Sequence, residues 1–543
     1  MEIKNLELPS LNKFASDYLQ GNLQAEEYFH YDLSKPGLFQ ERYKELMTRS
    51  FLRDELADYI QQYMSRFSMA APIVQKNIKA LRKADSVVVI GGQQAGLLSG
   101  PLYTIHKVIS IIKLAEEQEK SLGKRVIPVF WIAGEDHDLA EVNHVYVMKD
   151  GHPEKKSYPL YHPFKTMITD MELDAGTAMS WIEEILESYG ESAFTNDILK
   201  NVRAILEKGE TFAGFFAALM NEWFHKYGLL LMDAGDPALR KIESGYFKEL
   251  IEKSGKITDS VLTQQTLIQE NGYKRTIEME QNAANLFYYD RKKKERTLLE
   301  RSDSSFVAKN GELSFTEEDL IDVAEKRPEN LSNNVVTRPI MQEMLFPVLA
   351  FISGPGEIAY WAELKQAFEQ FGMKMPPIIP RLNITILERG IATDLAETGL
   401  ELGNVLAAGT REEQKLFLES VKDDHVENLF NETKLLLTEK HRLISEKAME
   451  LDRGLGPMLA KNRDLLIGQL DFIHGKIVKS TMDKHSVILR KFNRVETSLF
   501  PIGSPQERIW NIFYYLNKYG PEFIDDFMEL DYEFDNTHKV ICL

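Results

Sequence analysis

Short apolar runs that end in glycine or proline recur along the chain. SVVVIGG at 86–92 and VIPVFWIAG at 126–134 are apolar almost throughout, and a polar segment follows each of them. Such runs are typical of strands that are buried on both faces of a parallel sheet. The pattern returns in three later segments, which we expect to add strands to the same sheet: GLLLMDAGDP at 228–237, FPVLAFISGPGE at 346–357 and PPIIPRLNITIL at 376–387.

A helix is predicted between the first two of these strands. Pro101 stands where the helix would begin, Ser99 is a candidate cap, and Leu102, Ile105 and Ile109 share one face. A strand, a glycine-rich loop, a helix and a second strand make one βαβ unit, whose two strands are parallel. The predicted fold class is therefore α/β, with a parallel-sheet core.

The segment at 388–497 has a different pattern, because it is helical, charged and almost free of proline. Apolar residues recur every seven positions on two arms, which RGLGP at 453–457 separates: Leu429, Leu436 and Leu443, then Leu459, Leu466 and Ile473. This spacing predicts an antiparallel helical hairpin with coiled-coil packing, in which the two stripes pack against each other.

Some apolar residues of this hairpin would lack cover in a two-helix arrangement: Phe430, Leu437, Ile444 and Ile477. A second copy of the hairpin would supply the missing layer, so we expect a homodimer through the coiled coil. In the alternative arrangement the hairpin lies back on the core of its own chain.

These patterns divide the chain into four segments: a helical segment packing on the core at 1–85, the sheet core at 86–387 with insertions at about 150–225 and 240–330, the hairpin at 388–497, and a C-terminal segment returning to the core at 498–543. Two or more substructures are expected for a chain of this length.

Composition narrows the class of protein. The 543 residues carry a net charge of −18, which repels phosphate backbones and anionic lipid, so neither nucleic acid nor a membrane is an expected partner. The one cysteine, Cys542, can form no internal disulfide and no zinc knuckle. The sequence starts without a secretory pattern and has no apolar stretch long enough to span a bilayer. We therefore expect a cytoplasmic protein.

The most polar strand end is GGQQAGLLSGPLYTIHK at 91–107. Glycine lets backbone amides approach an anion, and the dipole of the following helix favours negative charge there. Gln93 and Gln94 can donate from the loop, and polar residues continue into the helix: Tyr103, Thr104, His106 and Lys107. We predict a ligand site here, although the loop lacks the Gly-Lys-Ser/Thr of a P-loop. The alternative is a tight strand-to-helix turn that needs glycine.

Four ionisable residues, EDHD at 135–138, directly follow the second strand. The carboxyl ends of parallel strands face the ligand crevice of such sheets. Clustered carboxylates beside a histidine can bind a cation or accept a proton. Adjacent residues point in different directions, however, so one tetrapeptide does not make a metal site. The alternative is an acidic first turn of the next helix.

Further polar residues could reach the same crevice from three later places: Glu357 and Tyr360 in SGPGEIAYW, Arg381 after the IIP run, and Asn333, Asn334 and Arg338 in LSNNVVTRP. In the segment at 498–520, a pocket could be lined by Gln506, Arg508 and Asn511. The alternatives are core packing for the aromatic residues and an ion pair for each arginine.

Four ordered strings together resemble the cysteine ligases of bacillithiol biosynthesis: GGQQAGLLSGPLYTIHK, PVFWIAGEDHDLAEVNHV, SGPGEIAYW with PPIIPR, and FPIGSPQER with FYYLNKYG. The resemblance implies a Rossmann-like core with inserted connecting segments and a dimerising α-helical coiled coil. It also implies addition of cysteine to glucosaminyl malate, which gives bacillithiol. The implied fold is similar to that of class I nucleotidyl-transferring synthetases, but the chain lacks their HxGH turn and Lys-Met-Ser-Lys-Ser loop.

An amide forms from a free carboxylate and an amine in water only after activation, so we expect an ATP-dependent carbon–nitrogen ligase. Mg²⁺ is allowed as a companion of ATP, and zinc is not expected. The loop at 91–101 would receive phosphate or carboxylate. The alternatives are a metal-dependent hydrolase or transferase that uses EDHD, and a non-catalytic coiled-coil scaffold.

The expected site falls into three groups of residues. Catalysis is assigned to Asp136, His137, Asp138 and His106. Substrate binding is assigned to Gln93, Gln94, Gly100, Tyr103, Thr104, Lys107, Glu135, Glu357, Tyr360 and Arg381. The nucleotide candidates are Gly92, Gly96, Arg508 and Asn511. If there is one site, the side chains of Gln94, His106 and Asp138 should open toward a common cavity.

Overall fold

In the computed structural model, which describes every residue except 10–11, 68–70, 163, 304 and 422–423, the chain folds into two units. Residues Met1–Ile386 and Gln506–Leu543 form the first unit, and Leu387–Pro505 form the second. The C-terminal end of the chain therefore belongs to the same unit as the N-terminal end.

A five-stranded parallel sheet lies at the centre of the first unit, in the order β13-β12-β2-β3-β6. Its strands are β2 (Val87–Gln93), β3 (Val126–Ile132), β6 (Leu230–Asp233), β12 (Val348–Ser353) and β13 (Ile378–Pro380). The first strand in sequence, β2, stands in the middle, and the chain continues to β3 and β6 on one side and to β12 and β13 on the other. The point between β2 and β12 is therefore the topological switch point of a doubly wound sheet.

The predicted apolar runs are strands because they are buried on both faces. In β2 the first five residues are buried, and in β3 all seven are. The helix predicted after the glycine loop is α6 (Leu102–Leu122), which packs on β2 and β3. Helices α4 (Arg53–Met64) and α5 (Pro72–Leu81) cover the end of the sheet at β6. This confirms the α/β fold class.

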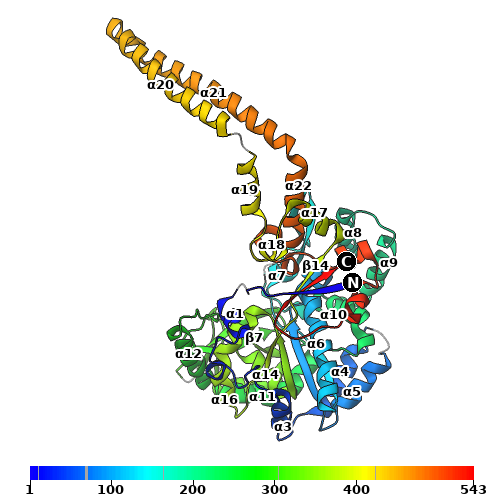
Figure 1. The fold of residues 1–543 in the computed structure, drawn as a ribbon. Coiled ribbons are helices and arrows are strands. Elements are labelled where there is room, and N and C mark those ends of the chain that lie inside the picture. The colour runs from blue at the N-terminus through cyan, green and yellow to red at the C-terminus, as the bar shows by residue number, and fades with distance from the viewer. Residues whose placement is uncertain (10–11, 68–70, 163, 304, 422–423) are drawn as a thin grey trace. The chain divides into compact units, whose positions relative to one another are not determined.

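The run predicted at 376–387 is split between two sheets. Its first part is β13, but its second part, β14 (Ile384–Leu387), joins a three-stranded sheet in the order β1-β15-β14. Strand β1 (Glu2–Leu6) pairs antiparallel with β15 (His538–Cys542), so the two chain ends lie side by side (Figure 1). The N-terminal segment is thus not helical throughout. EIKNL has no buried residue, so no apolar pattern marks it as a strand.

The two predicted insertions carry their own elements. The first contains β5 (His152–Ser157), which pairs antiparallel with the preceding β4 (His144–Lys149), and then helices α8 (Ala175–Tyr189), α9 (Thr195–Leu206) and α10 (Phe212–Phe224). The second contains helices and an antiparallel sheet in the order β10-β9-β8-β7-β11, which β11 (Leu331–Asn333) completes. The other strands of that sheet are β7 (Ala283–Asp290), β8 (Glu295–Ser302), β9 (Ser305–Ala308) and β10 (Ser314–Thr316).

The remaining α-helices of this unit are α1 (Lys13–Leu19), α2 (Ala25–Tyr28), α3 (Leu38–Leu46), α7 (Leu139–Val142), α11 (Pro237–Glu252), α12 (Ser254–Glu270), α13 (Glu317–Lys326), α14 (Thr337–Leu345), α15 (Pro355–Trp361), α16 (Lys365–Glu369), α23 (Gln506–Ile509), α24 (Ile512–Tyr519) and α25 (Phe523–Glu529).

Two long helices dominate the second unit. Helices α20 (Asp424–Leu451) and α21 (Gly456–Lys484) run side by side, and a short turn at Arg453–Leu455 joins them where RGLGP was predicted to separate two arms (Figure 1). The shorter helices of the unit are α17 (Arg389–Thr398), α18 (Leu402–Ala408), α19 (Arg411–Ser420) and α22 (Ser486–Leu499).

The predicted contact stripe of the hairpin is wrong. Five of the six residues expected to face the other helix are exposed instead, by 39–58% of their surface: Leu429, Leu436, Leu443, Leu466 and Ile473. The sixth, Leu459, is half-buried. The two helices meet through neighbouring positions. The ring of Phe430 lies 4.9 Å from that of His474, and Nε2 of His441 lies 3.2 Å from Oδ1 of Asn462. A spacing of seven defines a stripe, but it does not show which of two adjacent stripes faces the other helix.

Candidate active site at the switch point of the parallel sheet

A cavity of about 250 Å³ opens at the carboxyl ends of β2, β3 and β12, at the switch point of the sheet. Sheets of this topology bind their ligands at this place. Its lining is more polar than apolar and comprises Gly92, Gln93, Gln94, Trp131, Ala133, Asp136, Glu141, Val335, Arg338, Pro339, Gln342, Phe351, Glu357, Tyr360 and Trp361.

The glycine pair at the end of β2 is required by close packing. A Cβ atom on Gly92 would lie 2.8 Å from the backbone oxygen of Trp131 in the neighbouring strand, which is too close for any side chain. With no side chain there, Gln93 and Gln94 can line the cavity. The Nε2 of Gln94 donates to Oδ2 of Asp136 over 3.0 Å, which connects the tip of β2 to the segment after β3.

Lys107 and Glu357 form an ion pair beside the cavity. Nζ of Lys107 lies 2.5 Å from Oε2 of Glu357 and also donates to the backbone oxygen of Gly92 and to Oε1 of Gln93. Burial lowers the pKa of Lys107, although Glu357 favours its charged form. Lys107 is almost fully buried and lies outside the lining, whereas Glu357 belongs to it. Lys107 therefore fixes the tip of β2 and the carboxylate of Glu357.

Asp136 is the residue of EDHD that lines the cavity. Besides Gln94, it faces the guanidinium of Arg296, with Nη1 3.5 Å from Oδ1. Burial disfavours its charged form, but the charges of Arg338 and Arg296 outweigh this effect, so the pKa of Asp136 is lowered. Asp136 is therefore an ionised carboxylate held in a fixed orientation at the cavity wall.

Glu135 has a structural role and not the predicted role in substrate binding. It is fully buried, and its two carboxylate oxygens face Arg240, 2.5 Å away, and Arg338, 3.1 Å away. The backbone N–H of Asn333 donates to the same carboxylate. Because these partners occupy both oxygens, Glu135 anchors the segment after β3 and does not line the cavity.

His137 and Asp138 are not among the residues that line the cavity. Nδ1 of His137 lies 3.1 Å from Nη1 of Arg296, and burial and Arg296 lower its pKa. Asp138 is exposed and is the N-cap of α7, because its Oδ1 accepts a hydrogen bond from the backbone N–H of Ala140. The alternative reading of EDHD as an acidic helix start therefore holds for Asp138, and the catalytic role predicted for it is not supported.

His106 and Arg381 form a buried cluster with Glu507. Nδ1 of His106 lies 3.1 Å from Oε2 of Glu507, and Arg381 binds both oxygens of the same carboxylate. Burial lowers the pKa of His106, while Arg381 and His106 lower that of Glu507 against the effect of burial. The ring of Tyr103 lies under Arg381, and burial raises the pKa of Tyr103 to about 12. This cluster holds α23 against α6 and lies outside the cavity.

The predicted anion site at the start of α6 is closed. The backbone N–H of Leu102 donates to the oxygen of Trp510, and Nδ2 of Asn511 donates to the oxygens of Leu98 and Gly100. Leu98 has a φ of 51°, which is a left-handed conformation that costs energy for a residue other than glycine. The hydrogen bonds from Asn511 stabilise it in this conformation.

Several predicted ligand-binding residues are therefore packing residues. Gly100, Thr104 and Asn511 are buried in this loop, and Gly96 is a glycine because a Cβ there would lie 2.8 Å from Cα of Gly100. Arg508 is exposed and outside the cavity. A phosphate has no access to the start of this helix, so the nucleotide candidates Gly96 and Asn511 are wrong.

Residues 1–382 match the family model described as the N-terminal Rossmann-like domain of bacillithiol biosynthesis BshC, and residues 384–543 match that of its C-terminal coiled-coil domain. The chain belongs to the BshC family. A relative from Geobacillus sp. (strain WCH70) is 46% identical to this BshC-family chain over 545 residues, and one from Bacillus licheniformis is 42% identical over 543. All chains are covered completely, and both relatives are named "Putative cysteine ligase BshC".

The structure brings together some of the residues predicted for this BshC-family chain, and it adds others. Gly92, Gln93, Gln94, Asp136, Glu357 and Tyr360 line the cavity as a group. Arg338 of LSNNVVTRP, which was expected to reach the crevice, lines the cavity too, and the added polar residues are Glu141, Trp131 and Gln342. Nε1 of Trp131 and Nε2 of Gln342 are buried and have no hydrogen-bond partner among the described residues. A signal for Gln342 was its place one turn after Arg338 in the same helix, α14.

The expectation of a common cavity for Gln94, His106 and Asp138 is wrong, because only Gln94 lines it. Strand order correctly placed the glycine loop beside EDHD. Side-chain direction could not be predicted, because it depends on Arg296 and Glu507, which approach from distant parts of the chain.

Replacing Asp138 by Asn should leave turnover of the BshC-family chain within a few-fold, because Asn caps helix starts as well as Asp does. Replacing it by Ala should lower the free energy of unfolding by about 1 kcal/mol through loss of the cap. Steady-state kinetics and urea unfolding of both variants measure these effects. A hundredfold loss of turnover in Asp138→Asn with unchanged stability would instead support proton transfer by Asp138.

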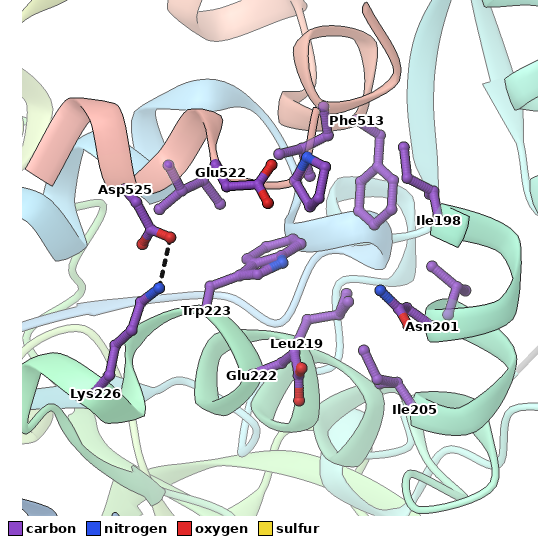
Figure 2. A pocket seen from close by; sticks show the side chains of 14 residues that line it. Ile198, Asn201, Ile205, Leu219, Glu222, Trp223, Lys226, Phe513, Glu522 and Asp525 are labelled. Carbon is purple, nitrogen blue, oxygen red and sulfur yellow. Dashed lines mark hydrogen bonds and ion pairs between the residues drawn. The ribbon is translucent and has the colours of Figure 1, made fainter. Parts of the chain in front are cut away.

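A second cavity, of about 200 Å³, lies between α9, α10, α24 and α25 (Figure 2). Trp223 and Phe513 contribute aromatic surface to it, and Lys226 at its rim pairs with Asp525 over 2.5 Å. No residue predicted from the motifs lines it. The switch-point cavity is therefore the candidate active site.

Two searches of the described residues complete this description of the BshC-family chain. They contain no group of three or more His, Cys, Asp or Glu side chains placed to hold a metal ion. Across the same residues, the helices are too short or too polar for any of them to cross a membrane.

Proposed function

We propose that the chain is a carbon–nitrogen ligase that joins L-cysteine to glucosaminyl malate and so forms bacillithiol. One observation carries the proposal: the switch-point cavity contains the carboxylates of Asp136, Glu141 and Glu357 together with the guanidinium of Arg338. A substrate with both an ammonium group and a carboxylate finds an opposite charge for each within this space. The names of the relatives support the choice of cysteine as one substrate.

The reaction also needs an activated carboxyl group, for which we propose a nucleoside triphosphate, ATP, as third substrate. The start of α6 does not fit its phosphates, because Trp510 and Asn511 cover it. Since the described residues contain no metal-binding group of acidic and histidine side chains, Mg²⁺ would enter with the nucleotide. Unpartnered donors on residues that line the cavity, such as those of Trp131 and Gln342, support binding of an acceptor-rich group there.

A direct assay tests the function. The purified full chain is incubated with L-cysteine, glucosaminyl malate, ATP and Mg²⁺, and bacillithiol is detected by mass spectrometry while each substrate is omitted in turn. Phosphorus NMR of the same samples separates ADP with phosphate from AMP with pyrophosphate. Amide formation only in the complete mixture is the expected result. Absence of bacillithiol in every mixture contradicts the proposal, and amide formation without ATP contradicts the nucleotide.

We also propose that a second copy of the chain covers the hairpin. Besides Leu436 and Leu443, large apolar residues are exposed on both long helices: Leu435, Ile444, Leu465, Phe472 and Ile473. A monomer rarely leaves so many large apolar side chains in water on one element. Another hairpin of the same kind would cover them in a four-helix arrangement.

Changing Leu436 and Leu443 together to Glu should convert the dimer to a monomer at micromolar concentration, because buried unpaired charges are costly. Both residues are exposed in the single chain, so the hairpin itself should remain folded. Analytical ultracentrifugation measures the change, and circular dichroism checks the helices. Thr438→Glu, at an exposed polar position of the same helix, is the control. A monomeric unmutated chain at this concentration would contradict the dimer and favour a hairpin packed within its own chain.

A further inference from the structure

Helix α7 carries Glu141 to the cavity. The helix starts directly after EDHD, where Asp138 caps it, and Glu141 occupies its first turn. Glu141 is exposed and also lines the cavity, so it lies at the mouth, in contact with solvent. The EDHD segment thus presents two carboxylates to one cavity: Asp136 from its own sequence and Glu141 through the helix that Asp138 begins.

A single amide group connects the two carboxylates. Nε2 of Gln94 donates to Oδ2 of Asp136 over 3.0 Å, and the Gln94 side chain is also hydrogen-bonded to Glu141. The other amide atom, Oε1 of Gln94, is buried and has no partner among the described residues. A cationic group that enters between Asp136 and Glu141 would therefore meet two carboxylates that the amide of Gln94 holds on either side.

The two carboxylates have different electrostatic surroundings. Asp136 lies beside Arg296 and Arg338, which keep it ionised by lowering its pKa. Glu141 is in no ion pair within the part of the chain that the structure describes. Loss of solvation and the charges of Asp136 and Asp138 raise its pKa, against the smaller effects of Gln94 and Arg338. The phenol of Tyr103, on α6, is the other titratable group that faces it.

We propose that Glu141 is the catalytic residue that accepts a proton from the ammonium group of the amine substrate, while Asp136 orients that group. This step rests on the proposed function. When the ammonium of glucosaminyl malate loses one proton to Glu141, its nitrogen attacks the activated carboxyl carbon of cysteine and forms the C–N bond. The tetrahedral adduct then loses a second proton to solvent water at the mouth and expels the phosphate-bearing oxygen, which leaves with the electron pair of the C–O bond. Glu141 returns its proton to solvent at the mouth.

Asp136 is less suited to this step, because Arg296 and Arg338 stabilise its charged form and so weaken it as a base. Two carboxylates whose pKa values are shifted in opposite directions commonly divide the roles of proton acceptor and charge partner between them. Here the carboxylate in contact with solvent has the raised pKa, and the carboxylate fixed by arginine has the lowered one.

The test compares the full chain with Glu141→Gln, Glu141→Asp and, as a matched neighbouring carboxylate, Asp138→Asn. The rate of bacillithiol formation is measured between about pH 4.5 and 9, a range that begins near the ordinary pKa of glutamate and extends above it. Calorimetry measures the affinity of each protein for glucosaminyl malate. Glu141→Gln should lower kcat by about 100-fold or more at neutral pH and change the dissociation constant only a few-fold. Glu141→Asp should recover part of the loss. Asp138→Asn should keep kcat at neutral pH within a few-fold and move the acidic limb to lower pH, because the charge of Asp138 raises the pKa of Glu141.

The pH profile separates proton transfer from a structural role. The unmutated chain should lose activity as pH falls through the raised pKa of Glu141, and Glu141→Gln should lack this acidic limb. If the unmutated chain is active and Glu141→Gln has the same kcat and the same pH profile, the role proposed for Glu141 is overturned and the proposed function is not. A variant that loses affinity but keeps kcat also overturns it. An unmutated chain that forms no bacillithiol overturns this step and the proposed function together.

Discussion

Asp136→Asn is expected to lower kcat/KM by roughly 10- to 100-fold, the range for loss of one hydrogen bond to a charged group. The carboxylate lines the switch-point cavity, and Gln94 and Arg296 fix its orientation. An asparagine keeps the shape of the side chain but cannot offer a negative charge to an ammonium group. The melting temperature should change little, because Asp136 is only partly buried and Asn can still accept the hydrogen bond from Gln94.

Steady-state kinetics and thermal melting of the same preparation measure both effects, and Asp138→Asn is the control. If Asp136 binds the ammonium group in the ground state and in the transition state, KM rises while kcat stays nearly constant. If it acts mainly in the transition state, kcat falls. Unchanged kcat/KM with a lower melting temperature would show that Asp136 only compensates the charges of the nearby arginines.

The sheet could be predicted from the sequence because its strands are buried on both faces. A strand such as β3 appears as seven consecutive buried residues, and a glycine turn follows it. Strand β1 could not be predicted in this way. It is a mostly exposed edge strand whose partner, β15, lies at the other end of the chain. Pairing over that distance leaves no local pattern in either segment.

The site could be predicted as far as its residues follow strand ends. Gln94 follows β2, Asp136 follows β3, and Glu357 follows β12, and all three line one cavity. The spacing of EDHD could not show which of its side chains would point inward. That choice depends on Arg240, Arg296 and Arg338, which come from the insertions and from α14 and bind the other side chains of the segment.

His106 shows the same limit. Its position one turn into α6 favoured a catalytic role, but Glu507 binds its ring from 401 residues away. The C-terminal segment supplies both the carboxylate for His106 and the cover for the helix start, through Trp510 and Asn511. In this loop and helix, the polar residues at the strand end, Gln93 and Gln94, line the cavity, whereas Thr104, His106 and Lys107 in the helix do not.

Arg240→Met should lower the free energy of unfolding by about 3–5 kcal/mol, which is the range for removing one partner of a buried ion pair and leaving the other. Arg240 is 1% exposed and bridges Glu135 and Glu243, each at 2.5 Å. Glu135 keeps Arg338 and the N–H of Asn333 after the change. Glu243 keeps no ion-pair partner among the described residues. Chemical denaturation of the full chain measures the loss, which is a large part of the stability of an ordinary domain.

The dependence on pH identifies Glu243 as the origin of this loss. Burial, opposed by Arg240, already raises the pKa of Glu243 to about 7, and removal of Arg240 raises it further. A carboxyl whose pKa is higher in the folded state than in the unfolded state destabilises the fold increasingly as pH rises above the unfolded value, about 4.3. The loss of unfolding free energy in Arg240→Met should therefore be smaller near pH 5, where Glu243 is protonated, than near pH 8.

Adding Glu243→Leu should restore most of the stability at pH 8, since a buried ion pair can often be replaced by apolar residues. An equal loss at both pH values, or no recovery in the double variant, would assign the effect to lost packing of the arginine side chain.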